Sequence, residues 1–286
     1  LNPANGTPIT VPSQDMVLGL YYITKVRPGV KGEGMRFYGP KEVIIALNEK
    51  AIDIHAKVNV RLPKNKLDLS EGYEMVETTP GRIFVNQYVP EEVPYINEVL
   101  GKKSLRKIIN NVIKYTGVAR TAQFLDDIKD LGYTMAFKGG LSFNLGDVII
   151  PEEKSQLIEA GYAKVREIEG HKAMGFITAN ERYNKIIDLW TTTDRQLTDI
   201  VEKQISSDQQ GFNPVYMMLD SGARGSKQQI KQLCGMRGLM AKPQKSGPQG
   251  ADMIENPIIS NLKEGMSVLE YFISTHGARK GLADTA

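Results

Sequence analysis

Two long amphipathic patterns in the second half of the chain constrain its fold more than any other feature. The first pattern spaces its apolar residues three or four positions apart, at Leu157, Ile158, Tyr162, Val165 and Ile168. The second continues the same spacing through Tyr183, Ile186, Ile187, Trp190, Leu197, Ile200 and Val201. This spacing places apolar side chains on one face of an α-helix. Because only a short break separates the two patterns, residues 151–206 are predicted to form an antiparallel helical hairpin.

The break between the two helices contains a predicted helix start. Residues 170–176 read GHKAMGF, and Thr178 with Glu181 has the spacing of a capping box at the start of the second helix. Two interpretations of the hairpin stay open: a helical pair packed inside a domain, and a projecting hairpin that serves as a docking surface.

Residues 1–150 mix strand and helix signals. Strands are expected in 6–12, 34–40 and 55–62, and a strand pair in 78–90. Helices are expected from an N-cap at Ser13 and from Pro40 in a first turn. Two further apolar stripes predict helices, one at Leu105, Ile108, Ile109, Val112 and Ile113 and the next at Phe124, Leu125, Ile128 and Leu131. This part is therefore predicted to be an α+β module.

Composition bounds the class of protein. With 286 residues, 41% apolar and 24% charged, the chain is expected to form two or three soluble modules. The single cysteine, Cys234, excludes an internal disulfide, fits a reducing compartment and is expected to be a small core residue. The sequence has no run of eighteen apolar residues and no signal-peptide pattern at its start. We therefore expect a cytoplasmic chain without a membrane partner. Leu1 and the helix-like pattern up to Ala286 further indicate a piece of a longer polypeptide.

One stretch is basic and contains an arginine among glycines. Residues 221–251 contain no acidic residue, and their cations are Arg224, Lys227, Lys231, Arg237, Lys242 and Lys245. The glycines beside Arg224, in SGARGS, allow close approach to a ligand. Ser226 can cap the following helix, whose N-terminus favours an anion. A phosphate site is one interpretation, since arginine makes forked contacts with phosphate oxygens. A solvated basic loop is the other.

The last expected helix contains two glycines one turn apart, Gly277 and Gly281. Each costs about 1 kcal/mol relative to alanine in a helix interior. Either another backbone approaches closely there, or the helix bends or lies beside nucleic acid and offers Arg279 and Lys280 to phosphates.

The sequence gives little sign of a metal centre. His55, His171 and His276 are far apart and lack the paired spacing of zinc ligands. Asp126 and Asp127 fall on an expected solvent face of a helix, and no cluster of carboxylates suits two metal ions.

Four long strings resemble the β′ subunits of bacterial DNA-directed RNA polymerases. They are NPANGTPITVPSQDMVLGLYYIT, ERYNKIIDLW, MMLDSGARGSKQQIKQLCGMRGLMAKP and ISTHGARKGLADTA, and the resemblance runs from Leu1 to Ala286. It implies an α+β multi-module fragment. Residues 1–150 resemble the mixed α/β pore module that lines the secondary channel. Residues 151–257 resemble the mainly helical funnel module, in which 151–212 form the rim hairpin that receives coiled-coil regulators. Residues 258–286 resemble the start of the cleft module, with the first half of the bridge helix.

The resemblance also implies roles for single residues. Arg224 aligns with an arginine that contacts the triphosphate of the incoming nucleotide. Gln14 matches a polar residue of the channel wall, and Met240 falls in a loop that abuts the bridge helix and the mobile trigger loop. The bridge-helix positions are His276, Gly277, Arg279, Lys280, Gly281 and Thr285.

Parts of the family pattern are not in this sequence. The string NADFDGD, whose aspartates hold the catalytic Mg²⁺, is expected before Leu1, and the trigger loop beyond Ala286. No catalytic or metal-binding residue is therefore assigned to this chain, which is expected to be inactive alone. The partners implied are the β, α, ω and sigma subunits, template DNA, RNA, nucleoside triphosphates and secondary-channel regulators. The implied location is the cytoplasm, in association with the nucleoid. A scaffold for regulators and an independent nucleotide-binding protein are the alternative functions.

Overall fold

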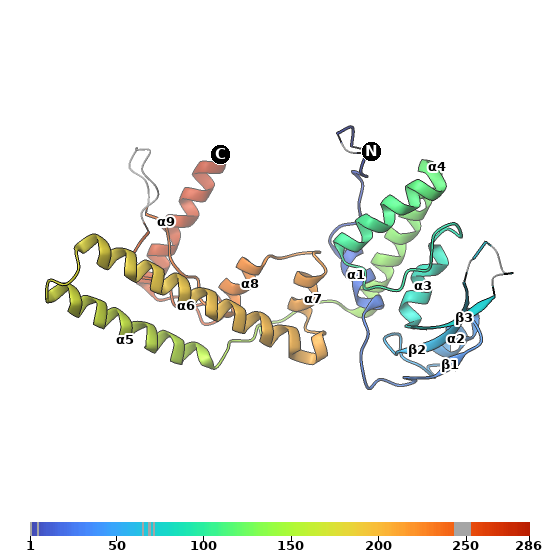
Figure 1. The fold of residues 1–286 in the computed structure, drawn as a ribbon, viewed down its shortest axis with the longest axis horizontal. Helices are drawn as coiled ribbons and strands as arrows, with labels where there is room; N and C mark the ends of the chain where they lie inside the picture. The colour runs from blue at the N-terminus through green and yellow to red at the C-terminus, as the bar shows by residue number, and fades with distance from the viewer. Residues whose placement is uncertain (1, 5, 65, 68–69, 71, 243–252) are drawn as a thin grey trace. The chain divides into compact units, whose positions relative to one another are not determined.

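A computed structural model describes residues 2–4, 6–64, 66–67, 70, 72–242 and 253–286, without the side chains of Lys280 and Asp284. Figure 1 shows an α+β chain with long helices and one small sheet. The chain divides into two compact units. Unit 1 contains residues 1–142 and 216–225, and unit 2 contains residues 143–215 and 226–286. Lys245, one of the cations of the basic stretch, lies outside the described residues.

The sheet of unit 1 has three strands in the order β1-β2-β3. Strand β1 (Arg36–Phe37) runs parallel to β2 (Val58–Pro63), and β2 pairs antiparallel with β3 (Tyr73–Thr78). The side chains of β2 alternate between buried and half-buried, as expected of a strand with one face on a core. Val58, Val60 and Leu62 pack on one face of the sheet, in a core with Val43 of α2 (Pro40–Asn48). The expected strand at this position and the helix that begins at Pro40 are confirmed.

The second core of unit 1 lies between α1 (Asp15–Thr24) and α4 (Lys102–Gly139). A Cβ at Gly19 would lie 2.0 Å from the carbonyl oxygen of Gly132, so the two helix backbones approach closely at paired glycines. Both expected apolar stripes lie in α4, on either side of Gly117. The φ of Gly117 is 77°, a left-handed conformation that interrupts the helix between them.

Three local expectations in unit 1 are wrong. Residues 6–12 form no strand, in line with their two prolines, which cannot donate to a ladder. Residues 78–90 contain α3 (Pro80–Tyr88), whose N-cap Thr79 accepts a hydrogen bond from the Arg82 amide. The N-cap of helix α1 is Gln14, whose φ is 52°, and not Ser13 as expected. No side chain caps this helix start.

Unit 2 is built on the predicted hairpin of α5 (Glu153–Ala173) and α6 (Ala179–Ser207), which lie side by side in Figure 1. The capping box of Thr178 and Glu181 is present. Trp190 is buried, and its ring meets Tyr162 edge-on at a centroid distance of 5.2 Å. Toward the turn, the apolar side chains become exposed.

The remaining elements follow the hairpin. They are η2 (Asp208–Gly211), α7 (Pro214–Asp220), α8 (Lys227–Cys234) and α9 (Val268–Thr285). Residues Tyr216–Asp220 of α7 belong to unit 1, and α8 belongs to unit 2. Across the described part of the chain, no helix combines the length and apolar character needed to span a membrane.

Candidate functional site

The loop that carries Arg224 has a backbone that only glycine adopts easily. Gly222 has φ 71° and Gly225 has φ 85°, both in the left-handed region. The amide of Arg224 donates to the carbonyl oxygen of Met218 at 3.2 Å, which fixes the loop onto the end of α7. The glycines expected from sequence to flank Arg224 therefore serve a tight turn.

A polar cluster holds the residues before this loop against α1. The phenol of Tyr21 donates to Oδ2 of Asp220 at 2.5 Å, and Nζ of Lys25 lies 3.2 Å from the Tyr21 oxygen. Nζ of Lys25 also lies 5.0 Å from the ring centroid of Tyr216. Burial raises the pKa of Tyr21, and the hydrogen bond to Asp220 raises it further. Tyr21 is therefore a protonated donor at neutral pH. Sequence reasoning missed this cluster.

Two further contacts anchor the same segment. The amide of Lys102, at the start of α4, donates to the carbonyl oxygen of Ser221 at 2.9 Å. Ala223 packs against the core between α1 and α4. The backbone on the N-terminal side of Arg224 is thus tied to both helices of that core.

The Arg224 side chain itself is exposed. Within the described ranges, its guanidinium has no hydrogen bond or ion pair to another side chain. A cation on a fixed backbone with open donors is suited to bind an anion, since little backbone freedom remains to be lost on binding.

The other cations of this stretch have different surroundings. Two lysines of α8 pair with carboxylates of α6. Nζ of Lys231 lies 2.7 Å from the carboxylate of Asp194, and Nζ of Lys227 lies 2.6 Å from that of Glu202. Nζ of Lys242 lies 5.6 Å from the ring centroid of Tyr183. Acidic residues of α6 therefore compensate the charges of Lys227 and Lys231.

Met240 and Gly277, both singled out from sequence, come together in unit 2. A Cβ at Gly277 would lie 3.3 Å from Sδ of Met240. The close neighbour at Gly277 is thus a methionine side chain rather than the backbone that one interpretation expected. Gly281 faces open space within the described part of the chain.

The other residues that the sequence analysis assigned to the site make fewer contacts. Gln14 is exposed at the start of α1, and its carbonyl oxygen accepts from the Leu18 amide at 3.0 Å. The ring of His276 meets Phe272 edge-on at 4.9 Å between centroids. Arg279 is exposed, and Oγ1 of Thr285 donates to the carbonyl oxygen of Gly281 at 2.7 Å.

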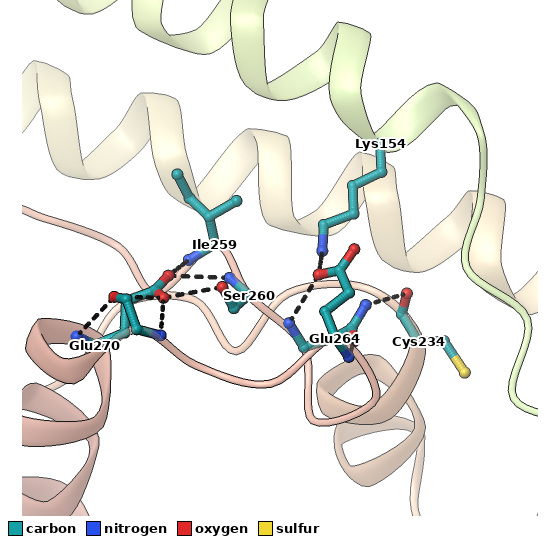
Figure 2. A network of polar contacts seen from close by, with 8 residues as sticks. Lys154, Cys234, Ile259, Ser260, Glu264 and Glu270 are labelled. Atoms are coloured by element: carbon teal, nitrogen blue, oxygen red, sulfur yellow. Dashed lines mark hydrogen bonds and ion pairs between the residues drawn. The ribbon is translucent and has the colours of Figure 1, made fainter. Parts of the chain in front are cut away.

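A carboxylate organises the start of α9 (Figure 2). Glu270 accepts hydrogen bonds from the amides of Ile259 and Ser260, each at 3.1 Å, and forms a capping box with Ser267. Burial raises the pKa of the Glu270 carboxyl, but hydrogen bonds from Ser267 and Ser260 outweigh burial and lower it to about 2. The spacing of Ser267 and Glu270 could have revealed this cap from sequence.

A second network in Figure 2 joins α5 and α8 to the segment before α9. The buried ammonium of Lys154 pairs with Glu264, which also accepts from the Asn261 amide. The side-chain amide of Asn261 donates to the carbonyl oxygen of Cys234 at 3.2 Å. Burial raises the pKa of the Cys234 thiol to about 11, so the thiol stays protonated. Cys234 is fully buried, which confirms the expected core role.

No group of three or more His, Cys, Asp or Glu residues suited to a metal ion occurs within the described ranges.

Comparison with known proteins gives consistent matches. Residues 1–148 match the family described as RNA polymerase Rpb1, domain 3, and residues 177–263 match RNA polymerase Rpb1, domain 4. Proteins named DNA-directed RNA polymerase subunit beta′ are 67% identical in Parabacteroides distasonis, 66% in Bacteroides fragilis and 59% in Flavobacterium psychrophilum. Each alignment covers 100% of this chain and 20% of the relative, so the chain spans a fifth of the relatives' length.

Proposed function

This chain belongs to the β′ subunit family of DNA-directed RNA polymerases, and from that premise we propose that it positions nucleotides for DNA-templated RNA synthesis. In this proposal residues 1–150 are the pore module beside the channel through which nucleotides enter. Residues 151–257 are the funnel module with its rim hairpin. Residues 258–286 begin the cleft module and contain the first half of the bridge helix.

Arg224 is the residue to which we assign contact with the triphosphate of the incoming nucleotide. The observation that carries this assignment is its exposed guanidinium, without a side-chain partner in the described part of the chain, on a backbone held by Met218 and Lys102. A guanidinium can donate two parallel hydrogen bonds to phosphate oxygens, and each charge-assisted bond is stronger than a neutral one. The role is to orient the substrate and offset its charge, without a covalent step.

The chemical step belongs to other parts of the polymerase. The Mg²⁺ that RNA polymerases use is held by residues outside this chain, and the β, α, ω and sigma subunits complete the enzyme around template DNA and RNA. Gln14 contributes to the channel wall. Met240 packs beside Gly277 of the bridge helix, which supports a loop that abuts that helix.

Substitution of Arg224 in a complete reconstituted polymerase tests this function. Arg224→Ala is expected to raise the KM for nucleoside triphosphates about tenfold or more, because a hydrogen bond to a charged group is worth about 1.5–3 kcal/mol. Arg224→Lys keeps the charge without the fork and is expected to give an intermediate KM. Arg195→Ala removes an exposed arginine of α6 and serves as the matched control. An unchanged nucleotide dependence in Arg224→Ala would remove this residue from the substrate site.

A second function, docking of regulators, is favoured by the turn of the hairpin. Met174 and Phe176, between α5 and α6, are 62% and 72% exposed. Exposed apolar side chains at the end of two packed helices suit contact with another protein. Phe176→Ser is expected to weaken binding of a coiled-coil regulator in a pull-down with complete polymerase while basal elongation is unchanged. Loss of elongation with intact regulator binding would contradict this function.

A further inference from the structure

The outer face of the three-stranded sheet carries a group of residues that the proposed function does not use. The register pairs Arg36 with Asn59 across β1 and β2, and Arg61 with Met75 across β2 and β3. Side chains on adjacent positions of a strand point to opposite faces. Because Val58, Val60 and Leu62 face the core, Asn59 and Arg61 face outward together with their cross-strand partners.

Two tyrosines lie on either side of Arg61 on this face. The guanidinium carbon of Arg61 lies 4.6 Å from the ring centroid of Tyr38 and 4.3 Å from that of Tyr73. Tyr38 is 72% exposed and Tyr73 46% exposed, so much of each ring remains accessible. Stacking on a ring holds a guanidinium in place while its N–H edges stay available to an anion.

The charge of this face is positive. Glu77 lies on the same side of β3, but Nζ of Lys57 pairs with its carboxylate at 2.7 Å. Glu42 accepts from the Tyr38 amide at 2.7 Å, so it is engaged at the start of α2. Within the described part of the chain, Arg36 and Arg61 have no acidic partner.

The face is also hollowed. A depression of about 520 Å³ is lined by Arg36, Phe37, Tyr38, Asn59, Arg61 and Met75. This volume is within the range of about 300–1,000 Å³ typical of small-ligand sites. The depression is therefore large enough for a nucleobase beside Tyr38 and Arg61, and Tyr73 lies outside its lining.

We propose that the face formed by Arg36, Tyr38, Arg61 and Tyr73 binds single-stranded nucleic acid. Bases stack on the accessible tyrosine rings, and backbone phosphates bind the two guanidinium groups. Proteins that bind single strands without sequence preference combine these two features, aromatic platforms and a positive surface. An acidic peptide would use the arginines alone and would leave the exposed ring faces without a role. The site is separate from Arg224 and does not depend on its assignment.

Photocrosslinking in complete polymerase tests the proposal. The main nucleic-acid site is first filled with a preformed DNA–RNA hybrid, and the probe is a single-stranded oligoribonucleotide of about twelve nucleotides that carries 4-thiouridine. Crosslinked peptides are then identified by mass spectrometry. We expect crosslinks in the peptides that contain β1 and β3, because the bases stack at Tyr38 and Tyr73.

Paired variants separate stacking from charge. We use two double variants. The first combines Tyr38→Ala with Tyr73→Ala, and the second combines Arg36→Gln with Arg61→Gln. Each double variant is expected to lower the crosslink yield about tenfold or more. Tyr38→Phe keeps the ring and is expected to retain most of the yield. Tyr115→Ala removes a tyrosine that is 60% exposed on α4 and serves as the matched control.

Three results would overturn the proposal. The first is an absence of crosslinks in these peptides in the unsubstituted polymerase, including the case in which another subunit covers the face. The second is an equal loss of yield in Tyr115→Ala. The third is displacement of the probe by a glutamate-rich peptide but not by unlabelled oligoribonucleotide, which would assign the face to a protein partner.

Discussion

Single residues around Arg224 have different tasks. Buried Tyr21, half-buried Lys25 and exposed Asp220 form a polar cluster that fixes the backbone, whereas the guanidinium remains open to an anion. A hydrogen bond to a charged acceptor is stronger than a hydrogen bond between neutral groups. Removal of the hydrogen bond between Tyr21 and Asp220 therefore tests the role of this cluster.

Tyr21→Phe removes the donor to Asp220 and keeps the ring. The free energy of unfolding of unit 1 is expected to fall by about 0.5–1.5 kcal/mol, because the hydrogen bond is lost and water can replace it at the exposed Asp220 carboxylate. The KM for nucleotides is expected to rise while kcat at saturating nucleotide changes less, since Arg224 itself is still present. Denaturant unfolding and steady-state kinetics measure the two effects. Tyr115→Phe, at an exposed site, is the control, and an unchanged KM in Tyr21→Phe would separate the cluster from Arg224.

At the scale of elements, the start of α9 depends on the ionisation of Glu270. The folded pKa of about 2 lies below the ordinary value of 4.5, so the carboxylate stabilises the folded state. This contribution is fully present above about pH 4.5 and declines as the pH falls from 4.5 toward 2.

Glu270→Gln is expected to weaken the start of α9 at neutral pH and to remove this part of its acid sensitivity. Hydrogen exchange of α9 amides in the two proteins at pH 7 and near pH 3 measures the difference. Equal acid sensitivity in both proteins would show that another group controls the helix start.

Substitution of alanine for a glycine is expected to change stability in opposite directions in α4 and in α5. Gly117 in α4 has φ 77°, so Gly117→Ala forces a side chain into a left-handed conformation and is expected to cost about 1–2 kcal/mol. Gly170 in α5 has open space at its Cβ position, so Gly170→Ala is expected to stabilise that helix by up to about 1 kcal/mol. Thermal unfolding of both variants provides the measurement, and the same sign for both would contradict the structure.

At the scale of the whole molecule, chain order and folding units do not coincide. Unit 1 contains residues 1–142 and also the distant segment Tyr216–Gly225, which carries Arg224. Ala223 of that segment packs against the core between α1 and α4. The nucleotide-binding role proposed for Arg224 thus depends on the stability of unit 1.

Ala223→Asp places a charge against this core. The free energy of unfolding of unit 1 is expected to fall by about 1–3 kcal/mol, because Ala223 is half-buried and a charged group placed there loses water without gaining a partner. Amide exchange is expected to accelerate in α1 and α4, and α5 and α6 of unit 2 act as the internal control. An equal acceleration of amide exchange in both units would mean that the segment Tyr216–Gly225 does not stabilise unit 1 alone.

Local sequence patterns predicted much of this fold. The alternation of Val58, Val60 and Leu62, the capping box at Thr178 and the cap at Ser226 depend on residues within a few positions of one another. The strand pair expected in 78–90 failed where the Thr79 cap and Pro80 start a helix instead. The glycines that flank Arg224 have the positive φ values that glycine accepts readily.

The sequence by itself determined the periodic helices, two of the three strands of the sheet and, through long matching strings, the family of the chain. Strand β3 was not expected from the sequence. Only the tertiary structure decided which charges are paired. Tyr21 meets Asp220 across 199 positions, and Lys231 meets Asp194 across 37. It also brought Tyr38 and Tyr73 to the two sides of Arg61. The physical reason is that periodicity and capping act between near neighbours along the chain, whereas charge pairing and ring stacking act between groups that only folding brings within a few ångströms.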